Sequence, residues 1–251
     1  MNVESKSYDI EFDQGRHWRA KLGFVLLATE QTVADDVYTL CPDGVGIHFT
    51  RVPIPDSITN ETLLALAPDL EKAAALMLPD GTLDVVSYAC TSGSLVVGEE
   101  RVCELLNAGA PNAKASCIIM AVGRALKAVG AKKIVVATPY LDEVNTAERD
   151  YMINDGFDVL DIQGLNLEKD SEMVRVTPSF IADFAASIDQ PEADAIFVSC
   201  GALRSIDIIE ALEQRVGKPV ITSNQAMVWD ALRLAGIEDR FDGYGKLFRD
   251  F

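Results

Sequence analysis

Short, largely apolar runs alternate with amphipathic segments along most of this chain. Runs such as 20–28 and 134–138 are typical of parallel strands covered on both faces. The intervening segments place apolar residues at helical spacing, most clearly over 205–216. This alternation predicts an α/β protein with right-handed crossovers. The expected strands are 20–28, 45–52, 83–89, 134–138, 157–162, 193–199 and 218–224. The expected helices are about 32–40, 59–78, 98–108, 117–129, 141–154, 178–188, 205–216 and 225–235.

The remaining segments are mostly polar. Residues 1–18 predict an extended arm that packs on the surface or on a partner subunit, with His17 at the surface. His48 alternates with apolar neighbours, which favours a packed or edge histidine over a catalytic one. Residues 167–176 are charged and predict a solvated loop, and 241–251 predict a tail.

The order strand, helix, strand, helix, strand, cysteine occurs twice. It is found once before residue 95 and once between 134 and 201. The two occurrences predict a degenerate duplication, in which Cys90 and Cys200 end equivalent strands. The carboxyl ends of parallel strands face the crevice where open α/β sheets bind ligands.

The other three of the five cysteines have simpler explanations. Cys41 lies in a turn, Cys103 is on the apolar side of a helix, and Cys117 is near a helix start where burial is expected. The number is odd, no CxxC spacing occurs, and only two histidines accompany them. A metal site is therefore not expected, and the cysteines should be thiols in a reducing compartment.

Two thiols facing each other across a cleft suit two kinds of chemistry. One thiol can remove a proton next to a carboxylate while the other returns one from the opposite face, or a thiolate can add to a carbon–carbon double bond and later leave. Backbone N–H groups of 91–93 and 201–202, with the hydroxyls of 91, 92 and 94, would hold the carboxylate. Neither route needs a cofactor, and no dinucleotide or Walker fingerprint is found. By spacing alone, two buried structural thiols explain the pattern equally well.

Composition narrows the possible partners. The chain has 251 residues, of which 49% are hydrophobic, and a net charge of −17. No basic patch is present that would bind nucleic acid. No signal peptide and no run long enough to span a bilayer is found, so a cytoplasmic protein without membrane contact is expected.

Five segments together resemble the Asp/Glu racemase superfamily, and within it the maleate cis-trans isomerases and arylmalonate decarboxylases. The form Ala-Cys-Thr-Ser-Gly-Ser looks like proteins linked to ectoine utilisation. The similarity covers most of residues 20–237. The segments are 26–32, 89–94, 138–145, 199–203 and 217–224.

The resemblance implies two pseudo-symmetric lobes, each a parallel sheet flanked by helices, with the active site in the cleft between them. We expect an N-terminal lobe of 1–110 plus 223–251 and a C-terminal lobe of 111–222. The resemblance also implies a cofactor-independent isomerase or racemase of a small carboxylate, and a homodimer is possible. Catalysis would fall to Cys90 and Cys200. The residues expected to bind substrate are Thr29, Glu30, Thr91, Ser92, Tyr140, Asn166, Gly201 and Ala202.

This chain differs from the maleate isomerases at Glu30 and from the arylmalonate decarboxylases at the first thiol, so the substrate stays open. Maleate isomerases have a neutral amide where this chain has Glu30, so Glu30 would repel a second carboxylate or bind an ammonium group, unless it only caps a helix. Asn166 ends a strand and lines the cleft or caps a loop. Arylmalonate decarboxylases lack the first thiol, and the presence of both favours an isomerase. The alternatives are a decarboxylase of a substituted malonate that uses Cys200 alone and a non-catalytic carboxylate-binding protein.

Overall fold

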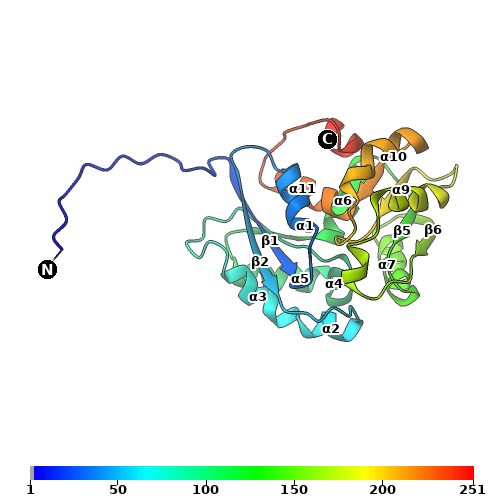
Figure 1. The fold of residues 1–251 in the computed structure, drawn as a ribbon, viewed down its shortest axis with the longest axis horizontal. Coiled ribbons are helices and arrows are strands. Elements are labelled where there is room, and N and C mark those ends of the chain that lie inside the picture. The colour runs from blue at the N-terminus through cyan, green and yellow to red at the C-terminus, as the bar shows by residue number, and fades with distance from the viewer. Residues whose placement is uncertain (1–2) are drawn as a thin grey trace.

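Two parallel sheets of four strands each form the body of the protein. The computed structural model describes residues 3–251 (Figure 1). The first sheet has the order β2-β1-β3-β4 and the second has the order β6-β5-β7-β8. The two orders are identical when β5 is matched to β1, which agrees with the predicted duplication. The strands are β1 (Ala20–Leu27), β2 (Val45–Val52), β3 (Val85–Tyr88), β4 (Lys114–Cys117), β5 (Lys133–Thr138), β6 (Asp158–Gly164), β7 (Ala195–Val198) and β8 (Val220–Thr222).

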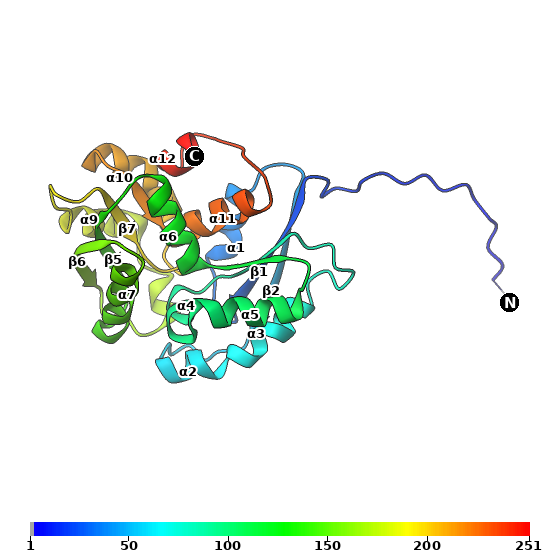
Figure 2. The same cartoon turned by 180° about the vertical axis from the view of Figure 1, so that it is seen from behind.

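Helices flank both sheets, as the apolar stripes predict. Helices α3 and α5 lie along one side of the first sheet, and α1 and α11 lie along the other (Figure 2). Helices α7, α9 and α10 pack on the second sheet. The helices are α1 (Val33–Leu40), α2 (Asn60–Ala65), α3 (Ala67–Ala75), α4 (Thr91–Val97), α5 (Glu99–Gly109), α6 (Ile118–Ala128), α7 (Asp142–Asn154), α8 (Asp170–Met173), α9 (Pro178–Ser187), α10 (Ile209–Val216), α11 (Ser223–Leu234) and α12 (Gly245–Asp250), with a 3₁₀ turn at Ile206–Ile208.

Strands β3 and β7 lie in the interior of their sheets, and each is followed by one of the two cysteines. Each is buried over its whole length, and Cys90 and Cys200 follow them by the same two-residue interval. Because equivalent strands end at the same edge of each sheet, the duplication brings the two thiols toward one cleft. Helix α11 follows β8 of the second sheet but packs against α1 and α6, so the chain returns toward the first sheet.

Four elements differ from the sequence-based expectation. Helix α4 begins at Thr91, where small polar residues disfavour helix and a loop was expected. Strand β4 occupies 114–117, between the expected helices 98–108 and 117–129, where the sequence pattern predicts no strand. The expected loop 167–176 contains helix α8, and the expected tail contains helix α12, whose Leu247 and Phe248 are fully buried.

The lobe boundary expected at residue 110 would place β4 in the second lobe. Instead β4 pairs with β3 through the whole of its length, from Val85 with Lys114 to Tyr88 with Cys117. The first sheet therefore extends to Cys117. The expectation failed because Lys-Ala-Ser-Cys has too few apolar residues to be recognised as a strand.

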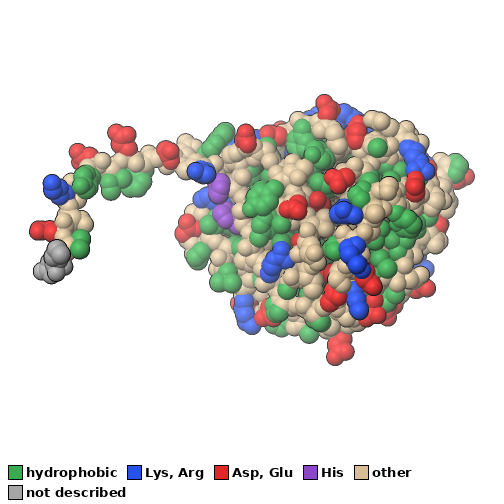
Figure 3. Space-filling model, viewed as in Figure 1, with side chains coloured by type: hydrophobic (Ala, Val, Ile, Leu, Met, Phe, Trp, Pro, Cys, Tyr) green, Lys and Arg blue, Asp and Glu red, His purple; other side chains and the backbone are tan. Residues whose placement is uncertain are grey.

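The N-terminal arm extends away from the body rather than packing on its surface (Figure 3). Tyr8 and Phe12 are 76% and 88% exposed. His17 is exposed, as expected, and its ring contacts His48 on the edge strand β2 at a centroid distance of 5.3 Å. Both histidines lie outside the cysteine cleft described below.

Within residues 3–251 no helix combines the length and the apolar character needed to cross a membrane. No group of three or more His, Cys, Asp or Glu side chains over the same residues is arranged to hold a metal ion.

Candidate active site

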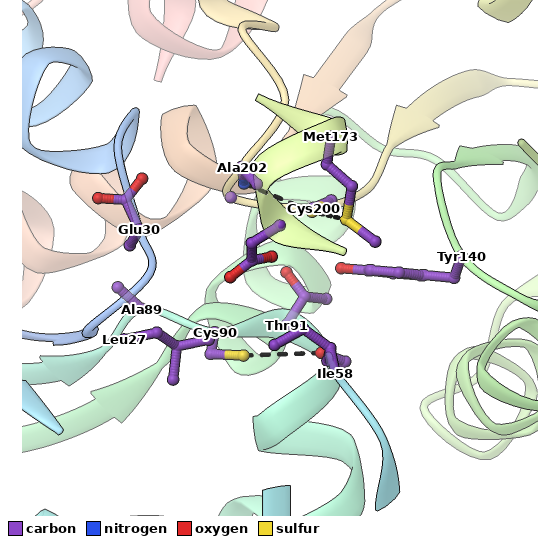
Figure 4. Close-up of a pocket in the computed structure, with 13 residues that line it drawn as sticks. Leu27, Glu30, Ile58, Ala89, Cys90, Thr91, Tyr140, Met173, Cys200 and Ala202 are labelled. Atoms are coloured by element: carbon purple, nitrogen blue, oxygen red, sulfur yellow. Dashed lines mark hydrogen bonds between the residues drawn. The ribbon is translucent and has the colours of Figure 1, made fainter. Parts of the chain in front are cut away.

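Both strand-end thiols line a single cavity between the two sheets. Figure 4 shows Cys90 and Thr91 on one side, Cys200 and Ala202 on the other, and the hydroxyl of Tyr140 directed between them. Eight of the ten expected site residues line it. The full lining is Leu27, Glu30, Ile58, Ala89, Cys90, Thr91, Ser92, Tyr140, Asp170, Met173, Cys200, Gly201 and Ala202.

Cys90 is the N-cap residue of helix α4. Its Sγ accepts a hydrogen bond from the backbone N–H of Gly93 at 3.2 Å and lies 3.6 Å from Ser92 Oγ. Burial raises the pKa of the Cys90 thiol to about 11, while these two donors oppose the rise. The thiol is therefore protonated at neutral pH, but the groups that would stabilise its thiolate are already in position.

Cys200 is held in a different way. Its backbone has φ 97°, a conformation that L-residues rarely adopt, and its N–H donates to Ser223 Oγ at 3.0 Å. The backbone N–H of Ala202 donates to Cys200 Sγ at 3.4 Å. Burial raises the pKa of the Cys200 thiol further than that of Cys90, and the Tyr140 phenol opposes the rise.

Hydroxyl groups converge on the space between the thiols. Thr91 Oγ1 lies 3.1 Å from Ser223 Oγ, which links the start of α4 to the Cys200 backbone. Tyr140 is 4% exposed, and burial keeps the pKa of its phenol well above the usual value, so it remains a donor. Together with Ser92, these side chains can donate to a carboxylate.

Glu30 lies at the cavity and caps helix α1 at the same time. Its Oε1 accepts from the N–H groups of Thr32 and Val33, the latter at 2.6 Å, while Oε2 is buried without a partner. Burial raises the pKa of this carboxyl. Glu30 therefore caps the start of α1 and lines the cavity, and its role toward a substrate stays a prediction.

Two expected binding residues lie outside the lining. Thr29 is behind it and donates its hydroxyl to Asp170 Oδ2. Asn166 is exposed, has φ 57°, and is not among the residues that line the cavity, so the loop-capping alternative fits its position here. Its N–H bonds to Tyr140 O at 3.3 Å, which makes it part of the loop that supports Tyr140.

Asp170 is a cavity residue that the sequence did not reveal. It opens helix α8, is 6% exposed, and lies inside the segment expected to be a solvated loop. The segment folds inward because Ser171 donates to Asp56 through its N–H at 3.1 Å and its hydroxyl at 2.7 Å, and Ile58 N–H donates to Glu168 O at 3.3 Å. Nothing in the local pattern of charges signals these contacts with residues more than a hundred positions away.

Two buried carboxyl groups stand behind Cys200. Ser199 donates to Glu148 Oε1 at 2.6 Å, and burial raises the pKa of Glu148 to about 7. Asn224 donates both to Asp36 Oδ2 at 2.7 Å and to Gly201 O at 2.8 Å, and burial raises the pKa of Asp36 to about 7. Asn224 thereby fixes the peptide that aims the Ala202 N–H at Cys200.

The cavity is closed in this structure. The volume that water can occupy is about 20 Å³, which is room for about one water molecule. A substrate therefore enters only after the walls move apart. The contacts of 168–171 with 56–58 join residues from the two halves across this cavity.

The fold and the two thiols in one cavity point to a known family of enzymes. A model of the family described as "Arylmalonate decarboxylase" matches residues 53–248, so the chain belongs to this family. It is 32% identical to arylmalonate decarboxylase from Bordetella bronchiseptica over 238 residues, which cover 90% of this chain and 95% of that protein. It is 25% identical to maleate isomerase from Nocardia farcinica over 241 residues, which cover 91% and 95%. The resemblance deduced from the sequence is confirmed.

Solved structures show the same fold. The maleate isomerase of Pseudomonas putida S16 superimposes with a TM-score of 0.84 at 23% identity, covering 92% of this chain and 98% of that one. A liganded double mutant of arylmalonate decarboxylase gives 0.82 at 26% identity, covering 92% and 100%. The unliganded decarboxylase gives 0.71 at 26% identity, covering 91% and 98%.

Proposed function

We propose that this protein is a cofactor-independent isomerase or racemase of a small carboxylate. The observation that carries the proposal is the presence of Cys90 and Cys200 in one cavity, at the ends of equivalent strands. A one-thiol decarboxylase would not need Cys90 there. Thr91, Ser92 and Tyr140 supply donors for the substrate carboxylate between the thiols.

The two thiols would have different roles. Cys90 has the lower pKa of the two and has N–H and hydroxyl donors at its sulfur, so it is the group that ionises first. Its thiolate either takes the proton from the carbon next to the carboxylate or forms a C–S bond to an alkene carbon. In both cases the electron pair moves toward the carboxylate, where hydroxyl donors stabilise it.

Cys200 would complete the reaction from the opposite side. In racemisation its thiol delivers a proton to the planar carbon, so one proton leaves and one arrives. In cis-trans isomerisation the Cys200 thiol protonates the carbanion formed by addition, and the C–S adduct rotates about what is now a single bond. The Cys200 thiolate then takes this proton back as the Cys90 thiolate leaves, which restores the alkene and both starting thiol states. A Nocardia farcinica maleate isomerase mutant with a covalently bound succinylcysteine intermediate provides a precedent for thiolate addition in a related protein.

Decarboxylation is the second candidate, because the family model and the 32% identical relative both carry that name. It would use Cys200 alone to protonate the carbon that loses carbon dioxide. The wall of the cavity contains Leu27, Ile58 and Met173, which can contact an apolar substituent.

The test is turnover by the wild type and by single Cys90→Ser and Cys200→Ser variants. Small carboxylates, including maleate, phenylmalonate and single enantiomers of amino acids, are incubated in deuterated water and followed by NMR and carbon dioxide release. We expect isomerisation or deuterium exchange in the wild type and a loss of about 10³-fold in each variant. Cys103→Ser is the matched control, since this thiol is half-buried outside the cavity.

Other results would redirect the assignment. Carbon dioxide release that survives Cys90→Ser would support the decarboxylase and end the two-thiol proposal. Binding of a carboxylate by the wild type without turnover or exchange would support a binding protein instead.

A further inference from the structure

The cavity is lined by two chemically different kinds of polar group. Thr91, Ser92 and Tyr140 present hydroxyl donors. Asp170 and Glu30 present carboxyl groups, and Oε1 of Glu30 already accepts from backbone N–H groups. None of the thirteen lining residues is Lys, Arg or His. A ligand in the cavity therefore meets hydroxyl donors and carboxyl groups, with no basic side chain among the lining residues.

Within residues 3–251, only one of the two carboxylate oxygens of Asp170 accepts a hydrogen bond. It is 94% buried, being 6% exposed, and its Oδ2 accepts the hydroxyl of Thr29. Over residues 3–251 no side chain or backbone group donates to Oδ1, and no cation pairs with this carboxylate. Burial raises the pKa of the Asp170 carboxyl, because ionising a carboxylate in so narrow a cavity without a counter-charge is costly. A ligand that brings a positive charge would remove that cost.

The position of Asp170 also bears on the thiols. Its negative charge opposes ionisation of both Cys90 and Cys200. A cation bound beside Asp170 would cancel this opposition at the moment the substrate arrives. The same carboxylate would therefore choose the substrate and keep the thiols protonated until the substrate is bound.

We propose that Asp170 recognises a cationic nitrogen on the substrate, an ammonium or amidinium group, while the carboxylate of the substrate binds the hydroxyls of Thr91, Ser92 and Tyr140. The substrate class is then a zwitterion derived from an amino acid rather than a dicarboxylate or an arylmalonate. This inference depends on the proposed function only because both place the substrate in the cavity between Cys90 and Cys200. A second carboxylate would face Asp170 and Glu30, and an aryl group would bury Asp170 against an apolar surface.

The proposal is tested with three unreactive probes of equal chain length. Butyrate carries one negative charge, succinate carries two, and 4-aminobutyrate is a zwitterion. Dissociation constants are measured by calorimetry at neutral pH on the wild type, Asp170→Asn and the control Asp56→Asn. Asp56 has the same charge and holds the same helix through Ser171, but it lies outside the cavity.

We expect the wild type to bind 4-aminobutyrate about tenfold or more tightly than butyrate, and succinate least tightly. Asp170→Asn should lose this preference for the zwitterion while binding butyrate within about twofold to threefold, and Asp56→Asn should keep the preference. Thermal melting of each variant checks folding, and Asp170→Ser replaces Asp170→Asn if the latter does not fold.

Three results would overturn the proposal. They are wild-type binding of succinate as tight as that of 4-aminobutyrate, a zwitterion preference unchanged by Asp170→Asn, and no measurable binding of 4-aminobutyrate. The first of these would indicate a protonated Asp170 that donates to a carboxylate. Because the probes do not react, their dissociation constants do not depend on the turnover tests with the cysteine variants. If the proposed reaction is not found, the binding preference can still be interpreted.

Discussion

Cys90 and Cys200 follow equivalent strands of two similar sheets, yet their surroundings have little in common. Cys90 caps a helix in an ordinary extended conformation, and its sulfur faces the N–H of Gly93. Cys200 has φ 97° and precedes an irregular turn. Behind it stand two buried carboxyl groups, Glu148 through Ser199 and Asp36 through Asn224.

The difference shows how a duplicated fold can separate the roles of two identical side chains. The strand framework determines where each thiol lies, and local hydrogen bonds determine how readily each one ionises. Cys90 is supported by donors at the sulfur itself. Cys200 is supported by groups that hold its backbone and that titrate near neutral pH. We therefore expect substitutions near Cys90 and substitutions near Cys200 to have different effects on turnover, stability and thiol reactivity.

Among residues that support the two cysteines, the largest effect is expected at Asn224. Replacement by Leu removes the donor to Asp36 and to the Gly201 carbonyl, leaving a buried carboxyl without its partner. Turnover should fall by about 10²-fold or more, with a loss of about 2–4 kcal/mol in the free energy of unfolding. Kinetics and denaturant melts measure both. Alkylation of Cys90 should change little, and an equal change at both thiols would contradict the separation of the two sites.

Gly93→Ala tests the surroundings of Cys90, whose sulfur accepts from the Gly93 N–H. A Cβ at this position would lie 2.9 Å from Tyr88 Cε1 and 3.0 Å from Cys90 Sγ, so the start of α4 must shift. We expect about 10–10²-fold slower turnover and a stability loss of about 1–3 kcal/mol. Ser92→Ala, which removes one weak donor without adding volume, is the matched control and should cost less. Unchanged kinetics in Gly93→Ala would argue against a role for this hydrogen bond.

Alkylation rates compare the thiols directly. Burial raises the pKa of Cys90 to about 11 and that of Cys200 further, so at any pH below both values Cys90 has the larger thiolate fraction. Mass spectrometry after iodoacetamide treatment should show Cys90 modified about tenfold faster or more. Cys117 is buried outside the cavity with its pKa raised to about 12 and serves as the reference. Faster modification of Cys200 would reverse the proposed roles.

The smallest expected effect concerns pH and stability. The Asp36 carboxyl has its pKa raised from 3.8 to about 7, so the folded state binds its proton more tightly than the unfolded state does. Between about pH 4 and pH 7 the folded state holds more protons, and the free energy of unfolding should fall as pH rises through this range. Asp36→Asn should flatten that slope by about 1–2 kcal/mol over the range. A slope that persists unchanged would assign it to Glu148 or to other groups.

Much of the framework could be predicted from apolar runs, because buried parallel strands need apolar residues on both faces. The positions of Cys90 and Cys200 followed from those strands. Helix α4 and strand β4 could not be predicted, since tertiary contacts override the weak local preferences of Thr-Ser-Gly-Ser and Lys-Ala-Ser-Cys. Asp170 was missed for a related reason, since its charged segment is drawn inward only by contacts with Asp56 and Thr29.

The left-handed backbone at Cys200 has a consequence for how the protein can be improved. Any L-residue at this position bears a strain of about 1–3 kcal/mol, which glycine would relieve. Random mutagenesis under selection for heat resistance would therefore favour Cys200→Gly, a change that removes the thiol. Directed evolution of this enzyme should combine any stability screen with an activity screen. Otherwise it will tend to select heat-stable proteins that lack the Cys200 thiol and no longer turn over substrate.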